Sequence, residues 1–180
     1  VEAVVEGVTR FRSGDAIYAR LDKHRIGAFA EYALVSEGAA AAKPKNLDWA
    51  EAASLPLVGL TAWQALIDLG GLKHAQKVLI HAGAGGVGSL AIQIARQHGA
   101  SVTATSTVAD YCRSLGAEEV IDYRSEDFAS AGPFDVVLDT LGGDAHLRSL
   151  GALKSAGLLV ALSAAPIPPH TAREDVRVEK

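Results

Sequence analysis

The sequence predicts an α/β protein built on a doubly wound parallel sheet, and two observations lead to this prediction. From Lys77 onward, short apolar runs rich in β-branched residues alternate with runs whose apolar residues recur at helical intervals. Three glycines, Gly83, Gly85 and Gly88, stand at G-x-G-x-x-G spacing between the first of these strands and the helix that follows it. Strands that alternate with helices in this way form a parallel sheet with helices on both faces.

Composition and charge limit the classes of protein to which the chain can belong. Its 180 residues are 49% hydrophobic and 21% charged, which is typical of a globular chain with one domain, or with one domain and part of another. The net charge of −4 gives no general attraction to nucleic acid or to an anionic membrane, so we expect neither as a partner. No apolar run approaches the roughly 20 residues that a membrane span needs. Any anion binding must therefore be local.

Cysteine and methionine usage adds two expectations. Cys112 is the only cysteine, so the chain can form no internal disulfide and no cysteine-rich zinc site by itself. A reducing compartment fits this composition, and we expect a cytoplasmic protein. The chain begins at Val1, contains no methionine and opens with no signal peptide pattern, so we expect it to be a window of a longer protein.

The first part of the chain, residues 1–46, has the pattern of a β-rich unit. Val1 to Ala19 contains two runs with alternating apolar positions, VEAVVEGV and AIYA, which predict two strands, and Gly27 to Val35 predicts a third. Ala39 to Ala42 has the pattern of a strand end. Lys43-Pro44 then predicts a linker, because proline disfavours helix in the residue before it. We therefore place the domain boundary here, with residues 47–180 as the second domain.

Two short helices are expected at the start of the second domain. Asp48 and Glu51 form a D-x-x-E capping pattern that opens the first helix. Pro56 interrupts this helix, because proline lacks an N–H group and clashes with the preceding turn. Leu57 to Leu69 then predicts a second helix, which Gly70-Gly71 ends.

The remaining elements define where a ligand should bind. In order, the pattern predicts strand Lys77 to Ala82, helix Val87 to His98, strand Val102 to Thr105, helix Asp110 to Leu115, strand Val120 to Asp122, strand Phe134 to Asp139, helix Asp144 to Leu153, strand Gly157 to Ser163 and strand Val176 to Glu179. In a doubly wound sheet the ligand crevice opens at the carboxyl ends of the strands where the order reverses, here the first and the fourth. Gly83 to Gly88 should thus face Asp139 to Gly143, which contains Leu141, across one cofactor.

Each glycine of the motif has a physical function at a dinucleotide site. Gly83 lets the chain turn sharply off the strand, Gly85 lets backbone N–H groups approach a pyrophosphate, and Gly88 lets the helix pack closely on the sheet. The anion then lies at the positive end of the helix dipole. A merely crowded turn would also use glycines, but the position between a strand and an amphipathic helix favours the dinucleotide site.

The segment about 20 residues after the glycines, which contains the second strand, favours NADPH over NADH. A site for NADH usually places an acid about 20 residues after the glycines, where it accepts from the ribose 2′-hydroxyl. Ser101 to Val108 contains no acid, whereas Thr105, Ser106 and Thr107 supply hydroxyl groups. Arg113 or Tyr123 could close this pocket from neighbouring elements; Arg113 could equally be a surface charge on a helix, and a tyrosine at a strand end such as Tyr123 is more often a rim residue.

Several longer motifs carry a resemblance to a known family. The run EGVTRFRSGDAIYA resembles E-G-V-x-x-F-x-x-G-D-x-V-Y, GAFAEYALV resembles G-x-[FY]-A-E-Y, and EAASLPLVGLTAWQAL resembles E-A-A-x-[LV]-P-x-x-x-x-T-A. HAGAGGVGSLAIQIA, SLGAEEVIDYR and DTLGGDAHLRSLGAL follow them. The chain thereby resembles the medium-chain dehydrogenase/reductase superfamily, and within it the zinc-free quinone oxidoreductase and zeta-crystallin branch. This resemblance implies the end of a GroES-like β domain in residues 1–46, followed by a Rossmann domain that is truncated at its C-terminal end.

The resemblance also implies roles for individual residues. The backbone of Gly85, Gly86 and Val87 would contact the pyrophosphate, while Ser106 and Tyr123 would meet the 2′-phosphate end. The nicotinamide would lie near Thr61 and the strand end Leu162-Ser163. The cofactor-binding residues expected from motif and resemblance together are Thr61, Gly83, Gly85, Gly86, Val87, Gly88, Ser106, Tyr123, Leu141 and Ser163. In one departure from the family pattern, Val108 to Arg113 contains no lysine, which weakens the 2′-phosphate assignment.

No metal site is expected. The zinc-dependent members of the superfamily insert a lobe with four cysteines where this chain has only Arg20 to Ile26, a segment without cysteine. His81, at the end of a buried strand, is interpreted as a packed histidine, and Cys112 as a helix residue.

By this resemblance the protein transfers a hydride from NADPH to a small electrophile. Without a metal the acceptor must itself be electron-poor, so a quinone is the favoured substrate and an enoyl or alkenal α,β-unsaturated carbonyl the alternative. A NADPH-binding protein without turnover, such as a crystallin or an RNA-binding relative, is the rival hypothesis. We assign no catalytic residue and expect a homodimer.

Overall fold

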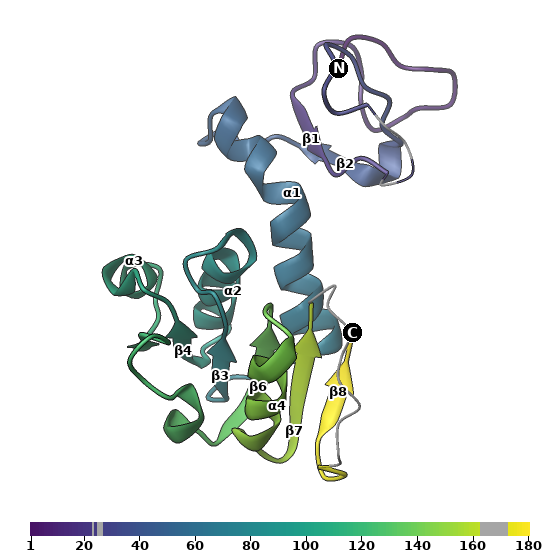
Figure 1. Ribbon diagram of the computed structural model, residues 1–180. Coiled ribbons are helices and arrows are strands. Elements are labelled where there is room, and N and C mark those ends of the chain that lie inside the picture. Colours follow the sequence, from purple (N-terminus) through teal and green to yellow (C-terminus); the bar gives the residue numbers. More distant parts are fainter. Residues whose placement is uncertain (23, 25–26, 163–172) are drawn as a thin grey trace. The chain divides into compact units, whose positions relative to one another are not determined.

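A computed structural model describes residues 1–22, 24, 27–162 and 173–180 (Figure 1). Their contacts divide the chain into two compact units, Val1–Leu60 and Thr61–Lys180. The division falls inside helix α1 (Trp49–Trp63), later than the domain boundary placed between residues 46 and 47. That boundary rests on sequence pattern and family resemblance rather than on compactness, and it stays a prediction.

The first unit contains one small antiparallel sheet. Strand β1 (Ile17–Ala19) pairs with β2 (Ala40–Ala42), and Tyr18 lies opposite Ala41. A single 3-10 turn, η1 (Glu37–Ala39), leads directly into β2. The strand predicted at AIYA and the strand end predicted at Ala39 to Ala42 are thereby confirmed.

Two other strands predicted for this unit are wrong. Neither the run VEAVVEGV nor the described residues of Gly27 to Val35 form a strand. Alternating apolar residues favour a half-buried strand, but a strand also needs a neighbour that pairs with its backbone N–H and C=O groups. Within the described part of the unit only β1 and β2 pair with each other. Phe29, Tyr32 and Leu34 are consequently exposed.

Helix α1 begins as the capping pattern predicts but does not end at its proline. The Asp48 N–H donates to Glu51 Oε2 at 2.9 Å, and the Glu51 N–H donates to Asp48 Oδ1 at 2.7 Å, which is the reciprocal pairing of a capping box. The helix then runs through Pro56 to Trp63, so the predicted interruption is wrong. The proline deprives only the Ala52 carbonyl of its N–H donor, and the turns on both sides remain helical.

A π-helix, η2 (Gln64–Leu69), continues α1 and stops at the predicted glycine pair. The Gly70 N–H donates to the Ala65 carbonyl at 2.9 Å, five residues earlier. A Cβ on Gly70 would lie 2.4 Å from the Leu66 carbonyl oxygen, so no larger residue fits this end of the helix. Gly71 follows with φ of +54°, the left-handed conformation that commonly ends helices.

Together, α1 and η2 form the described segment whose length and composition would suffice for a membrane span. Trp49–Leu69 has 21 residues and a mean hydropathy of 1.3, which corrects the expectation that no apolar run approaches that length. Core helices of globular proteins meet the same two criteria. Ala62, Ala65 and Leu66 at its C-terminal end are buried in the core of the second unit, although only 22% of the segment's most apolar window is buried.

The second unit is built on a six-stranded parallel sheet with the order β5-β4-β3-β6-β7-β8. Its strands are β3 (Lys77–Ile80), β4 (Ser101–Thr105), β5 (Glu119–Ile121), β6 (Phe134–Asp139), β7 (Leu153–Ala161) and β8 (Arg177–Glu179). The order reverses between β3 and β6, the first and fourth strands, as predicted. The largest difference from the predicted limits is at β7, which begins at Leu153 because this residue already pairs with Phe134 of β6.

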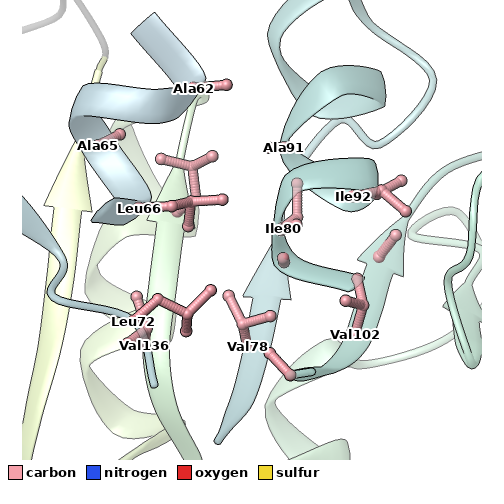
Figure 2. Close-up of a cluster of buried hydrophobic side chains, with 14 of the residues drawn as sticks. Ala62, Ala65, Leu66, Leu72, Val78, Ile80, Ala91, Ile92, Val102 and Val136 are labelled. Atoms are coloured by element: carbon pink, nitrogen blue, oxygen red, sulfur yellow. The ribbon is translucent and has the colours of Figure 1, made fainter. Parts of the chain in front are cut away.

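Helices cover both faces of this sheet, which confirms the doubly wound fold. The helical elements are α2 (Gly86–Gln97), α3 (Ala109–Ser114), η3 (Phe128–Ala131) and α4 (Gly143–Gly151). Successive strand residues face opposite sides. Val78 and Ile80 of β3 therefore pack with α2 and η2 in the cluster of Figure 2, while Leu79 packs in a second cluster with residues of α4 and η3.

Candidate functional site

The chain leaves the carboxyl end of β3 through a turn made by Ala82. Ala82 has φ of +51°, in the left-handed region that residues with a Cβ seldom adopt. Its carbonyl accepts the Gly85 N–H at 2.9 Å, and its N–H donates to Thr105 Oγ1 at 3.2 Å. The glycine spacing predicts this sharp turn at Gly83, but in the structure Ala82 has the positive φ, and two hydrogen bonds hold it in that conformation.

Close packing explains the first and last glycines of the motif. A Cβ on Gly83 would lie 2.8 Å from Ala104 Cβ and 3.2 Å from Cys112 Sγ. A Cβ on Gly88 would lie 2.2 Å from the Ala82 carbonyl oxygen. Gly88 thus lets α2 approach the end of β3, and Gly83 lets the turn lie directly on β4 and α3.

The N-terminus of α2 presents backbone donors without partners. Gly85 is the N-cap and has no side chain to cap the helix, and the first helical bond is that from the Ser89 N–H to the Gly85 carbonyl at 2.9 Å. The N–H groups of Gly86, Val87 and Gly88 therefore lack an acceptor within the part of the chain that the structure describes. Unpaired N–H groups at the positive end of a helix fit a phosphate or pyrophosphate. The predicted dinucleotide matches this arrangement.

Ser106 lies at the same edge of the sheet, where β4 and β5 end. The Gly83 N–H donates to the Thr105 carbonyl at 2.9 Å, and the Ser106 N–H donates to the Ile121 carbonyl at 3.0 Å. The Ser106 hydroxyl oxygen accepts the Val108 N–H at 3.0 Å, so its hydrogen can still donate to a ligand. The structure therefore brings the glycine turn and Ser106 together, and Tyr123 follows β5 as an exposed residue.

Two arginines lie on the segments that follow β4 and β5, and both are paired with carboxylates. Arg113 lies 3.3 Å from Asp110, and Arg124 lies 2.6 Å from Asp122. The hydrogen bonds from Arg124 lower the pKa of Asp122 to about 2. Both guanidinium groups are more than half exposed to water, so an incoming phosphate could compete for either of them.

A buried carboxylate fixes the loop that contains Leu141. Asp139, the last residue of β6, accepts the N–H groups of Leu141 and Gly142 on Oδ1, both at 2.9 Å. Its other oxygen, Oδ2, lies 2.8 Å from Nδ1 of His146 in α4. Three donors thus compensate a carboxylate that is fully buried. Leu141 itself is half exposed at the loop.

His81 is fully buried directly after β3, and its ring has hydrogen-bond partners on both sides. Nδ1 lies 3.1 Å from Thr105 Oγ1, and Nε2 lies 2.9 Å from Ser149 Oγ. Burial lowers the pKa of His81 to about 4; nearby Asp139 opposes this shift and Arg148 adds to it. The ring is therefore neutral near pH 7, and the interpretation as a packed histidine is confirmed.

The residues predicted to approach the nicotinamide lie in two different elements. Thr61 is half-buried in α1, directly before Ala62, whose side chain belongs to the core cluster of Figure 2. Leu162 follows β7, and its N–H donates to the Asp139 carbonyl at 2.8 Å, so this strand end adjoins the Leu141 loop. Ser163 lies outside the described residues.

Comparison with known proteins identifies the family. Residues 86–177, about half of the chain, match the family model described as zinc-binding dehydrogenase. The chain belongs to the zinc-binding dehydrogenase family. The membership of the medium-chain dehydrogenase/reductase superfamily that the motifs predicted is thereby confirmed.

The relatives of this chain include several proteins named as oxidoreductases. NAD(P)H oxidoreductase RTN4IP1, mitochondrial, of Danio rerio is 38% identical over 157 residues, which cover 82% of this chain and 41% of the relative. NADPH-dependent alkenal/one oxidoreductase, chloroplastic, of Arabidopsis thaliana is 37% identical over 180 residues, or 94% of this chain and 46% of the relative. The quinone oxidoreductase structure from Pseudomonas syringae pv. Tomato DC3000 superimposes with a TM-score of 0.88 at 33% identity, over 99% of this chain and 60% of that one. The chain spans about half the length of the curated relatives it matches.

Despite the family's name, the described residues of this chain contain no group of three or more His, Cys, Asp and Glu side chains placed to hold a metal ion. Two features near the glycine turn were not predicted from the sequence. The first is the turn at Ala82 itself, and the second is a pair of buried polar residues in α4, Ser149 and His146, which bond to His81 and Asp139. Thr105 and Asp139 were singled out, but not their hydrogen bonds to Ala82 and to the Leu141 loop. Their positions as polar residues at the ends of apolar strands were the signal for these bonds.

Proposed function

We propose that this family member is an oxidoreductase that transfers a hydride from NADPH to a quinone. The observation that carries the proposal is the row of unpaired N–H groups of Gly86, Val87 and Gly88, at the point where the strand order reverses. Bound there, NADPH would supply the hydride from its nicotinamide, while the protein orients it. The names of the Danio rerio and Pseudomonas syringae relatives, an NAD(P)H oxidoreductase and a quinone oxidoreductase, support the same chemistry.

We expect NADPH to bind more tightly than NADH, by about tenfold or more. Ser101 to Val108 contains no carboxylate that would repel a 2′-phosphate, Ser106 retains a hydrogen to donate, and Arg113 and Arg124 lie on neighbouring elements. Titration of nicotinamide fluorescence with both cofactors, on the full-length protein, measures the two dissociation constants. Equal or reversed affinities would contradict the NADPH assignment.

The segment between β1 and β2 supports a zinc-independent reaction. Arg20 to Ile26 contains no cysteine, and Cys112, the only cysteine of the chain, is buried in α3. Without a Lewis acid, the acceptor must be electron-poor or must be polarised by hydrogen-bond donors where negative charge develops. Quinones and α,β-unsaturated carbonyls meet this condition better than simple aldehydes.

Reduction of an α,β-unsaturated carbonyl is the second candidate function, because the relative from Arabidopsis thaliana is named an alkenal/one oxidoreductase. NADPH oxidation by the full-length protein, measured with a panel of quinones and enones, distinguishes the two. Faster turnover of quinones supports the first proposal, and faster turnover of enones supports the second. NADPH binding without oxidation by any acceptor would contradict both and favour a non-enzymatic protein.

The same assay, repeated after exhaustive chelation, tests whether activity requires a metal. Activity lost together with stoichiometric zinc would overturn zinc independence.

Location and assembly are proposed with this function. The single cysteine fits a reducing compartment, so the cytoplasm remains the proposed location. The net charge of −4 gives no support to a nucleic acid partner. A homodimer is the proposed assembly, and light scattering on the full-length protein measures its mass.

A further inference from the structure

Both loops that flank the proposed cofactor crevice are bonded to one helix, α4. The glycine turn follows β3, and the Leu141 loop follows β6, the neighbouring strand in the sheet. Neither loop relies only on its own backbone. Each is joined to α4 by a chain of buried side-chain hydrogen bonds, and the two chains end on residues three positions apart, His146 and Ser149.

The first chain leads from the glycine turn to Ser149. Its hydrogens can be assigned, because each hydroxyl has a single one to donate. The Ala82 N–H donates to Thr105 Oγ1 (3.2 Å), and the Thr105 hydroxyl then donates to His81 Nδ1 (3.1 Å). His81 Nε2–H in turn donates to Ser149 Oγ (2.9 Å), whose hydrogen goes to the Ala145 carbonyl (2.6 Å). Every polar side-chain atom in this chain has a partner, so removing any one leaves a buried group unpaired.

The second chain leads from the Leu141 loop to His146. Asp139 accepts the N–H groups of Leu141 and Gly142 on one oxygen and His146 Nδ1–H on the other, at 2.9, 2.9 and 2.8 Å. His146 is 1% exposed, and its Nε2 has no hydrogen-bond partner among the described residues. The connection of this histidine to the loop therefore passes entirely through Asp139.

The geometry points to α4 as the element that positions both cofactor loops, with Ser149 and His146 as positioning residues that need not touch the cofactor. They lie at i and i+3 on one buried face of the helix, so they move together. Ser149 acts on the strained Ala82 turn, and His146 acts on Leu141 and Gly142. This inference rests on the proposed function, since it takes the crevice between the two loops as the NADPH site.

The expected effect is a loss of NADPH affinity in a protein that still folds. Losing one of these buried hydrogen bonds leaves its partner unpaired in the native arrangement, so the loop populates other conformations. Apparent affinity falls in proportion to the fraction of molecules with the loop in place. Ser149→Ala and His146→Ala should therefore each raise the NADPH dissociation constant of the full-length protein by about five- to tenfold.

A matched control separates positioning from general stability. Like Ser149→Ala, the variant Ser130→Ala removes a hydroxyl group that donates to a backbone carbonyl one turn earlier. For Ser130 this acceptor is the Asp127 carbonyl, at 2.7 Å. Ser130 is exposed in η3, before β6, at the opposite edge of the sheet. This variant should leave the NADPH dissociation constant unchanged.

The conservative variant His146→Asn provides a rescue. Its side-chain amide N–H can occupy the place of Nδ1–H and donate to Asp139, and nothing is lost at Nε2, which has no partner among the described residues. The dissociation constant of His146→Asn should stay within about twofold of the wild-type value. This variant also keeps the test decisive if His146→Ala fails to fold.

NADPH titration and ligand-free melting temperature are measured on all four variants and on the wild type. Weakened binding by Ser149→Ala and His146→Ala, with recovery by His146→Asn, supports the inference. Wild-type affinity in a folded Ser149→Ala protein overturns it, as does weakened binding by His146→Asn equal to that by His146→Ala. If the wild type binds neither NADPH nor NADH, the proposed function itself fails. If the wild type binds NADPH and the variants bind it equally well, only the positioning role of α4 fails.

Discussion

Ala82 adopts a left-handed backbone conformation at the centre of the proposed site. For a residue with a Cβ this conformation costs about 1 kcal/mol or more. The hydrogen bonds of its N–H to Thr105 and of its carbonyl to Gly85 offset that cost. Thr105 also bonds to His81. The hydrogen bonding of this buried imidazole is therefore coupled to the turn that would receive the pyrophosphate.

The stability of the protein should depend on pH through His81. In the unfolded chain this residue binds a proton below about pH 6.5, whereas in the folded protein burial lowers its pKa to about 4. Between these values the unfolded state binds more protons, so stability rises with pH across this window and is lost as pH falls through it. The expected contribution is about 3 kcal/mol between pH 4 and pH 7.

Urea unfolding of the wild type and of His81→Gln across this pH range measures the effect. The variant does not titrate at this position, so the wild type should gain stability relative to it as pH rises from 4 to 6.5. All other ionisable groups are shared and cancel in the difference. Parallel pH profiles for the two proteins would show that His81 is not the buried neutral group described here.

At the scale of elements, helix α1 contains Pro56 and remains helical on both sides of it. Pro56→Ala should restore the hydrogen bond to the Ala52 carbonyl and raise the free energy of unfolding by about 2 kcal/mol. Ser54→Ala, on the exposed side of the same helix, keeps all backbone bonds and should change it by less than about 0.5 kcal/mol. Chemical denaturation of both variants provides the comparison. A Pro56→Ala protein less stable than the wild type would show that the proline shapes α1 in a way the neighbouring turns require.

Elements with strong local signals were predictable from the sequence. The buried strands β3, β4 and β6, helix α2 after the glycines and the capping box at Asp48 and Glu51 lie within two residues of the positions that their patterns indicate. Gly27 to Val35 shows the opposite case, because its alternation is present but its strand partner is not. Pro56 is a similar case. Proline disfavours a helix locally, but the hydrogen bonds of the turns on both sides keep α1 helical through it.

The site was predictable only in part, for a related reason. Spacing alone indicated that the glycines and the Asp139 to Gly143 loop would share one edge of the sheet. The sequence positions of His146 and Ser149 show no such link, because their contacts to Asp139 and His81 form only after β6 and α4 pack together. A buried histidine in a helix is compatible with many roles until its partner is known.

For the whole molecule, the second unit contains most of the buried core. In the described part of Val1–Leu60 only Ala40 and Ala52 are buried apolar residues, whereas the sheet of Thr61–Lys180 has a core on each face. The chain spans about half the length of its curated relatives. The proposed dinucleotide site belongs to the unit with this well-packed core, so its function can be tested separately from the identity of the acceptor.

The most direct test of the dinucleotide site is the NADPH dissociation constant of Gly85→Ala in the full-length protein, measured beside its ligand-free melting temperature. Gly85 has φ of −79°, which alanine can adopt, and its Cβ would lie 3.1 Å from the Ala82 carbonyl oxygen, so only a small adjustment is needed. Gly88→Ala is the matched control, because its Cβ would lie 2.2 Å from the same oxygen and should lower the melting temperature. We predict that Gly85→Ala melts near the wild-type temperature and binds NADPH at least about tenfold more weakly. A Gly85→Ala protein with a lowered melting temperature and wild-type affinity would contradict the account.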